Sequence, residues 1–418
     1  MADRKVYVYV DLDGTIHHVG LLWARLIQEK ECSSFQHDKS WLSSQEKFSL
    51  EPALSLAECT YHTNANRNLF GALGDSAPDH WGRILMRRSA AALARTSKTP
   101  TRTLTEIDYL FGVCDEARQG ALRFSDTLGG PFLKPPNSTT IPPLIELPRL
   151  LSATERLLSD KESDEDLKLL LAPGSSLGGA RPKASVRDRN GQLAIAKFPR
   201  KDDDFSTVLW EAVALKLAGK AGLEVPKWRL EYIATKPTLI IHRFDRHFEK
   251  RIPFLSALSI IGAQDNEDHS YLEIIDAIRQ HGSSPKEDII NLWKRIVFSI
   301  LISNTDDHLR NHGFLYEKNK GWKLSPLYDI NPTPLEIKPR ILSTAINLYE
   351  ATASLDLALS VAKQFELTQE EAKKIAKELG SVVINWKNEA KHFHISTQEI
   401  NRMASAFEHQ DLIQTTRF

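Results

Sequence analysis

The stretch that decides the fold is Ser303–Phe314, which reads SNTDDHLRNHGF. It follows residues 289–302, an apolar run long enough to predict a buried helix. Because packing poorly explains so many polar side chains at the end of a buried helix, the run indicates a functional loop. Within it, Asp306 and Asn311 are five residues apart. A surface loop with helix-capping Asp and Asn is the alternative interpretation.

The spacing of Asp306 and Asn311 is that of a protein-kinase catalytic loop. In such a loop the Asp accepts or orients the proton of the substrate hydroxyl, and the Asn binds Mg²⁺. Asp329 lies 18 residues after Asn311, beyond an expected hairpin over 313–323. Asp329 could bring a second carboxylate to the same metal. Taken by itself, it could equally be an ordinary aspartate in a turn.

A glycine cluster lies further towards the N-terminus, in residues 174–183 (GSSLGGARPK), before an expected hairpin over 183–198 with an Asn-Gly turn. Clustered glycines let backbone amides approach phosphate oxygens, but this pattern is not a Walker motif, and a flexible loop is the alternative. Lys197 lies in an apolar strand, where a kinase needs a lysine for the ATP phosphates. An exposed edge-strand lysine is the other interpretation. Glu211, on an expected helix over 206–219, is either its ion-pair partner or a solvated glutamate.

Residues 11–15 (DLDGT) match the motif of haloacid-dehalogenase-type phosphatases, with Asp11 as nucleophile and Asp13 as general acid. The segment from Asp75 to Asp79 resembles the later metal-binding motif of those enzymes. It comes only about sixty residues on, which leaves little room for the intervening α/β core. Since Asp13–Gly14 also suits a tight turn, a β-hairpin is the favoured interpretation.

The composition is that of a globular protein with two or three domains: 418 residues, 41% hydrophobic and 26% charged. Lys plus Arg and Asp plus Glu are 54 each, and this balance disfavours a protein that binds nucleic acid unaided. Three cysteines without a CxxC pair predict neither disulfides nor structural zinc. The longest apolar stretch, near 296–302, is far short of the ~18 residues that span a bilayer. With no signal-like N-terminus, we expect a cytoplasmic protein.

Together these motifs resemble the HipA-like toxin serine/threonine kinases of bacterial toxin–antitoxin systems. The resemblance covers nearly the whole chain and rests on seven segments: FSLEPAL (48–54), LFGALGDSAPDHWGR (69–83), GSSLGGARPKASV (174–186), AKFP (196–199), HRFDR (242–246), NTDDHLRN (304–311) and SPLYD (325–329). It implies an α+β, two-lobe protein-kinase-like fold. Residues 1–130 would form an α/β N-terminal subdomain, 131–250 the N-lobe with the Gly-rich loop, and 251–418 an all-helical C-lobe.

The resemblance also implies roles for individual residues, with ATP and Mg²⁺ as cofactors. Asp306 would be the catalytic base, supported by His308, and Asn311 and Asp329 would be the metal ligands. Ser176 would be autophosphorylated. The residues that would contact ATP are Lys197 at the phosphates, Gly178, Gly179 and Ala180 in the Gly-rich loop, His242 and Phe244 near the hinge and adenine, and Tyr328. The family pattern differs at two of these segments, because some members have Glu at the position of His242 and many have Gln at that of Arg181.

The family resemblance further implies partners. Substrates would include aminoacyl-tRNA synthetases, and a small helix-turn-helix antitoxin would bind the operator DNA, so that this neutral chain meets DNA only indirectly and meets no membrane. A non-catalytic kinase-fold partner of such an antitoxin is the alternative, which the intact Lys197, Asp306, Asn311 and Asp329 disfavour.

Overall fold

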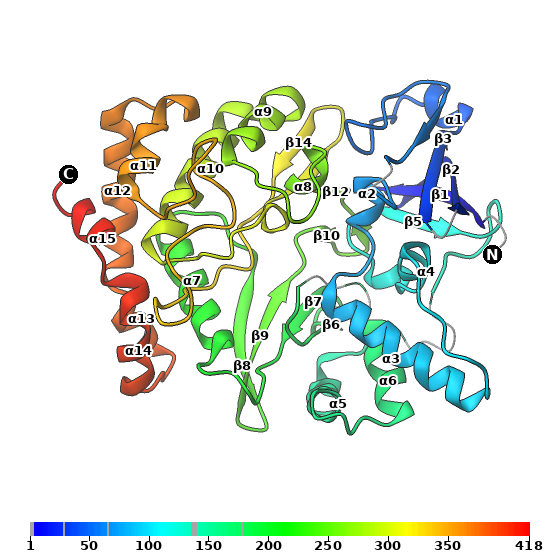
Figure 1. Cartoon of the computed structure of the whole chain (residues 1–418), viewed down its shortest axis with the longest axis horizontal. Coiled ribbons are helices and arrows are strands. Elements are labelled where there is room, and N and C mark those ends of the chain that lie inside the picture. The colour runs from blue at the N-terminus through cyan, green and yellow to red at the C-terminus, as the bar shows by residue number, and fades with distance from the viewer. Residues whose placement is uncertain (1–3, 28–29, 65–66, 135–139, 175, 177–178) are drawn as a thin grey trace. The chain divides into compact units, whose positions relative to one another are not determined.

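The computed structural model describes residues 4–27, 30–64, 67–134, 140–174, 176 and 179–418 (Figure 1). The chain forms two compact units, the first made of residues 1–202 and 230–255 and the second of 203–229 and 256–418. It contains both helices and sheets, which confirms an α+β protein. Among the described residues, no helix is both long and apolar enough to cross a membrane.

The first unit begins with an antiparallel sheet in the order β4-β3-β2-β1-β5. Asp13 and Gly14 both have positive φ, 54° and 88°, so they form the tight turn that joins β1 to β2 and confirm the predicted hairpin. The elements are β1 (Arg4–Leu12), β2 (Thr15–Ile27), β3 (Lys30–His37), α1 (Lys39–Ser43), β4 (Thr60–His62), α2 (Gly71–Gly74), α3 (His80–Thr96), α4 (Glu106–Phe111), η1 (Asp115–Ala117) and β5 (Leu122–Ser125).

A second sheet in this unit has the order β6-β7-β9-β8, and its β6–β7 pair is the predicted Asn-Gly hairpin. One face of this sheet packs on α3, α5 and α6, because Trp81, Leu150 and Leu170 share one hydrophobic core with Ala184 and Ala196. The elements are η2 (Leu144–Glu146), α5 (Leu147–Leu158), α6 (Asp164–Gly174), β6 (Lys183–Arg187), β7 (Leu193–Lys197), β8 (Trp228–Ile233), β9 (Lys236–His242), β10 (Arg246–His247), β11 (Lys250–Arg251) and β12 (Phe254–Ser256).

The second unit is built around α10, which buries most of its length from Ile289 onward, as its apolar run predicts. A further aromatic cluster joins α7, α13 and α14, with Trp386 stacked on Phe407 at 4.5 Å between ring centroids. The elements are α7 (Thr207–Lys220), α8 (Ala257–Ile260), α9 (Tyr271–His281), α10 (Pro285–Leu301), η3 (Leu309–Asn311), β13 (Gly313–Glu317), β14 (Gly321–Leu324), α11 (Leu355–Ser360), η4 (Ala362–Phe365), α12 (Gln369–Val383), α13 (Trp386–His392), α14 (Thr397–Phe407) and α15 (Gln410–Thr415).

One sequence-based expectation for this part of the chain needs correction. The C-terminal part is not all helical, because β13 and β14 form an antiparallel hairpin, with Gly321 at φ 120° where the second strand begins. Further along, α12 begins after Thr368 and ends at Val383. There the Asn385 side chain donates to the Ser381 carbonyl at 3.0 Å and satisfies a terminal carbonyl group.

A buried glutamate in the first unit gives a testable pH dependence. Glu51 is 1% exposed and accepts the Ala72 backbone N–H at 2.5 Å. Burial raises the pKa of Glu51 from its ordinary value near 4.5 to about 7, against the opposing effects of Ala72 and Arg67. Between these two values the folded protein holds a proton that the unfolded chain releases. The free energy of unfolding therefore falls as the pH rises through this window, by roughly 3 kcal/mol from this group.

We expect Glu51→Gln to remove this part of the pH dependence, because the amide keeps an oxygen for Ala72 and carries no charge. Urea unfolding between pH 4.5 and pH 8 measures it, with Glu58→Gln, at an exposed position of the same unit, as the control. Identical pH slopes for Glu51→Gln and the wild type would show that Glu51 is not the group responsible.

Candidate active site

The predicted catalytic loop follows α10 and exposes one of its two adjacent aspartates. Ser303 has φ 52° and turns the chain out of the helix. Thr305 and Asp307 are 0% and 1% exposed, whereas Asp306 between them is exposed. Only Asp306 thus offers its carboxylate to a molecule in solution.

Asp307 is the internal anchor of this loop. Its Oδ2 accepts hydrogen bonds from the Tyr271 hydroxyl at 2.7 Å and the Ser299 hydroxyl at 3.1 Å. Its Oδ1 lies 3.1 Å from His312 Nε2. Burial alone would raise the pKa of the Asp307 carboxyl, but His312 and these hydroxyls outweigh burial and hold it below its ordinary value. Asp307 is therefore ionised and fixed, which holds the backbone of its neighbour Asp306.

The two predicted metal ligands belong to segments that are bonded to this loop. Asn311 donates its Nδ2 hydrogen to the Asp306 carbonyl at 3.0 Å, which leaves its amide oxygen as the remaining acceptor. The β13–β14 hairpin brings the chain back, and Tyr328 donates to the Arg310 carbonyl at 2.7 Å. The next residue, Asp329, has φ 56°, a conformation that costs a non-glycine residue about 1–2 kcal/mol and that clusters at functional sites.

An amide oxygen and a carboxylate suit Mg²⁺, which binds through one or two carboxylates together with substrate phosphates. In the part of the chain that the structure describes, no group of three or more His, Cys, Asp or Glu is placed to hold a metal ion. Asn311 and Asp329 thus have the donor atoms that Mg²⁺ prefers, and a site built on them would need further ligands.

His308 and Tyr328 both contact the backbone of the loop. The ring Nδ1 of His308 is buried with no hydrogen-bond partner among the described residues, while its backbone N–H donates to the Asp306 carbonyl at 2.9 Å. His308 thus supports the loop through its backbone. The Tyr328 hydroxyl bonds Arg310, and a contact of Tyr328 with the nucleotide stays a prediction.

Sequence reasoning missed three side chains beyond Asp329 that hold the catalytic loop. Lys338 and Ser343 donate to the Thr305 carbonyl at 3.3 and 3.0 Å, and Thr344 donates to the Asp307 carbonyl at 2.7 Å. Ordinary polar residues in a loop carry no spacing signal, so the sequence offered no means of finding them.

Apart from Tyr328, the predicted nucleotide-binding residues lie in the first unit, as does Ser176. Ser176 is 4% exposed, and its hydroxyl has no hydrogen-bond partner among the described residues. Gly179 has φ 72°, which glycine adopts without strain, and Ala180 is exposed. Lys197 is half-buried at the end of β7, paired in register with Lys183 of β6 and Leu239 of β9. Gly178 lies outside the described residues. Glu211 is buried on α7 in the second unit.

Comparison with known proteins identifies the family of this chain. The family model of the HipA-like C-terminal domain matches residues 175–386, a range that includes Ser176, Lys197, the catalytic loop and Asp329. The chain belongs to the HipA-like family.

Individual relatives support the same assignment. Two curated relatives, Y4mE of Sinorhizobium fredii and a protein of Haemophilus influenzae, are each named "Putative kinase". The first is 24% identical over 72% of each chain; the second is 30% identical over 38% of this chain and 54% of its own. Among solved structures, HipA of the Shewanella oneidensis MR-1 toxin–antitoxin system, in complex with HipB and operator DNA, superposes with a TM-score of 0.67. That match covers 99% of this chain and 97% of the other at 14% identity, so it shows the fold.

In this HipA-like protein the residues of the HRFDR motif make several contacts within the first unit. His242 Nε2 lies 2.8 Å from Asp188 Oδ2, and the Phe244 ring lies 6.4 Å from that of Phe254. The Arg243 guanidinium forms a bidentate ion pair with the buried Asp245, with hydrogen bonds of 2.8 and 2.5 Å. Asp245 also accepts the Gly120 backbone N–H at 2.8 Å. Although burial opposes ionisation, Arg243 and Arg246 hold the pKa of Asp245 far below its ordinary value.

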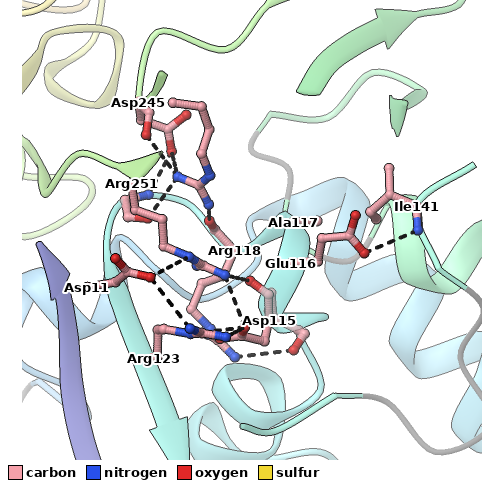
Figure 2. Close-up of polar contacts among 12 residues, drawn as sticks. Asp11, Asp115, Glu116, Ala117, Arg118, Arg123, Ile141, Asp245 and Arg251 are labelled. Atoms are coloured by element: carbon pink, nitrogen blue, oxygen red, sulfur yellow. Dashed lines mark hydrogen bonds and ion pairs between the residues drawn. The ribbon is translucent and has the colours of Figure 1, made fainter. Parts of the chain in front are cut away.

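Asp11 belongs to the same buried polar region, which Figure 2 shows. Its Oδ1 accepts the Gly14 backbone N–H at 3.0 Å, and its Oδ2 lies 3.5 Å from Arg123 and 3.8 Å from Arg251. Asp11 also lies in an antiparallel hairpin, so it is not at the end of a parallel strand, where the phosphatase motif would place its nucleophile. The geometry therefore does not support the phosphatase interpretation.

Proposed function

We propose that this HipA-like protein is a serine/threonine protein kinase that transfers the γ-phosphoryl group of ATP, with Mg²⁺, to a hydroxyl of another protein. The observation that carries the proposal is that the two adjacent aspartates of the predicted catalytic loop differ: one is exposed and the other is buried. Asp306 is exposed five residues before Asn311, while Asp307 is buried and held by Tyr271, Ser299 and His312. Phosphoryl transfer depends mainly on positioning and electrostatics, and a rigidly anchored loop with one available carboxylate supplies both.

In the proposed reaction, the substrate hydroxyl oxygen bonds to the γ-phosphorus, and Asp306 accepts the hydroxyl proton. The bond from the γ-phosphorus to its bridging oxygen breaks, and ADP leaves with that oxygen. Asn311 and Asp329 would hold Mg²⁺, which when bound neutralises charge on the phosphates. Asn311 also bonds the Asp306 carbonyl, so the metal-binding side chain helps fix the position of the base.

Lys197 would bind the α- and β-phosphates, and the loop that contains Gly178, Gly179 and Ala180 would cover them. His242 and Phe244 are the proposed neighbours of adenine. The contact of His242 with Asp188 supports the proposed adenine site, because it holds the side chain of the proposed hinge residue in one place.

A small helix-turn-helix antitoxin is the proposed partner, and DNA would be reached only through it. Two observations support this: Shewanella HipA, which shares the fold, was solved with HipB and operator DNA, and the net charge of this chain is zero. An aminoacyl-tRNA synthetase in the cytoplasm is the proposed class of substrate, on the strength of the family resemblance.

Incubation of the purified protein with Mg²⁺ and γ-labelled ATP tests the proposal, and Asp329→Ala gives the matched variant. We expect Asp329→Ala to need much more Mg²⁺ for half-maximal transfer and to lose on the order of 10²-fold or more in rate, since the metal stabilises the transferring phosphate. A titration of rate against Mg²⁺ concentration measures both. Normal turnover of this variant at limiting Mg²⁺ would contradict the metal assignment, and no label transfer by the wild type would contradict the proposed function.

Ser176 is the proposed autophosphorylation site, and we expect its modification to be self-inactivating. Phosphate adds roughly −1.5 to −2 charges at neutral pH, and beside bound ATP it would repel the γ-phosphate. Ser176 is 4% exposed, so it must leave its place before it can accept phosphate, and the phosphorylated loop cannot keep its present conformation.

Mass spectrometry after incubation with Mg²⁺ and ATP locates the phosphate, and equilibrium ATP binding measures the consequence. Ser176→Ala should bind ATP and lose the modification, whereas Ser176→Asp should bind ATP more weakly. Ser175, outside the described residues, is the alternative acceptor. A Ser176-phosphorylated protein with unchanged ATP affinity would contradict the switch.

A further inference from the structure

The first turn of α3 contacts the Gly-rich loop through an aspartate that does not cap its own helix. Asp79 occupies the N-cap position of α3, where aspartate normally accepts an N–H of the first helical turn. Here no such bond forms. Instead, Asp79 Oδ2 accepts the backbone N–H of Gly179, one hundred residues later, at 2.9 Å.

The contact is reciprocal. The backbone N–H of Trp81, one of the amides that a helix start leaves without an internal partner, donates to the Gly179 carbonyl at 3.0 Å. Both backbone groups of Gly179 are therefore bonded to the first turn of α3. A bond to a carboxylate is roughly twice as strong as a neutral one, so the Asp79 contact is the stronger of the two.

The ends of the loop lie against the same helix. The Trp81 indole donates to the carbonyl of Lys183, where β6 begins, at 2.8 Å. At the other end, a Cβ on Gly174 would come within 2.3 Å of Leu85 Cδ1, so only glycine fits there without displacement. Trp81 and Leu85 are each 1% exposed and belong to the core beneath the second sheet. This half of α3 is a rigid support.

We infer that Asp79 is a positioning residue that docks the Gly-rich loop on α3 and, by doing so, keeps Ser176 buried. Ser176 lies between the two glycines that contact α3, and its hydroxyl is buried without a hydrogen-bond partner among the described residues. The contacts at Gly174, Gly179 and Lys183 therefore contribute to holding it there. Release of Gly179 from Asp79 makes Ser176 accessible.

Thiol labelling of a Ser176→Cys protein tests this docking without ATP. Trypsin leaves residues 169–183 as one peptide that contains no native cysteine, so mass spectrometry reads the label at position 176 directly. In this background, Asp79→Ala should raise the labelling rate about ten-fold, the scale expected for loss of a hydrogen bond to a charged acceptor. Asp79→Asn keeps an acceptor oxygen and should give an intermediate rate.

Two controls separate docking from general destabilisation. Asp38→Ala removes a working helix cap in the same unit, since Asp38 accepts the Ser40 N–H at 2.8 Å, and it should leave labelling at position 176 unchanged. Cys114, 5% exposed in the first unit, reports any wider unfolding in the same sample. Equal acceleration at Cys114 and at position 176, or no acceleration by Asp79→Ala beyond that by Asp38→Ala, would overturn the inference.

The consequence for phosphorylation rests on the proposed function and is measured separately. With Ser176 intact, Asp79→Ala should speed phosphate incorporation at Ser176 from Mg²⁺ and ATP by a similar factor. Faster labelling with no phosphate at Ser176 in any variant would leave the docking established and refute the proposed autophosphorylation.

Discussion

Asp306→Asn should lower the rate of phosphoryl transfer by about 10²- to 10⁴-fold, the range over which a positioned general base contributes. The amide has the shape of the carboxylate but cannot take the hydroxyl proton. The fold should be unaffected, because the Asp306 side chain is exposed and the loop is held by its neighbours. Label transfer to protein measures the rate, and urea unfolding of the same preparation measures the stability.

The matched control is Asp276→Asn, an exposed aspartate on α9 in the same unit, which should change neither quantity. Full activity of Asp306→Asn would show that another group accepts the proton. Loss of activity together with unfolding would show that Asp306 has a structural role which its exposure does not reveal.

The spacing of residues in the catalytic loop was enough to select Asp306 over Asp307, because the distance to Asn311 along the chain is a local property. The hydrogen bonds that Asp307 accepts do not depend on its neighbours in the sequence. Its partners Tyr271 and Ser299 lie 36 and 8 residues away along the chain, and no short motif predicts these contacts. The spacing therefore selected the aspartate that is exposed, but it could not show the network that holds its buried neighbour.

The fold shows the same division. Apolar periodicity and an Asn-Gly turn located α10, α7 and the β6–β7 hairpin, since each depends on neighbouring residues. The HRFDR motif was interpreted as a hinge segment, and no local pattern indicated that its Asp245 also binds Gly120, 125 residues earlier in the chain. Asp79 bonds Gly179, one hundred residues later, and no short motif indicates that contact either. Contacts of this kind escape sequence reasoning because the partner lies far along the chain.

Asp307→Ala should destabilise the second unit strongly. The carboxylate of Asp307 compensates other buried charges as well as accepting hydrogen bonds. Burial lowers the pKa of Arg295 to about 10, and Asp307 and Asp288 oppose that effect. Without Asp307, the Arg295 guanidinium loses a carboxylate that compensates its charge, and Tyr271 and Ser299 lose their acceptor. Removal of one member of a buried ionic network typically costs about 3–5 kcal/mol.

Asp307→Asn separates charge from hydrogen bonding at this position. The amide oxygen can still accept from Tyr271 or Ser299, but it no longer offsets the charge of Arg295. We therefore expect Asp307→Asn to lose some stability, but less than Asp307→Ala loses. Urea unfolding at neutral pH gives the free energy of unfolding of the wild type and of both variants. A stability that falls in the order wild type, Asn, Ala would show that the charge and the hydrogen bonds both contribute. Wild-type stability in Asp307→Ala would mean that Lys338, Ser343 and Thr344 are enough to hold the loop, and that the buried Asp307 is dispensable for the fold.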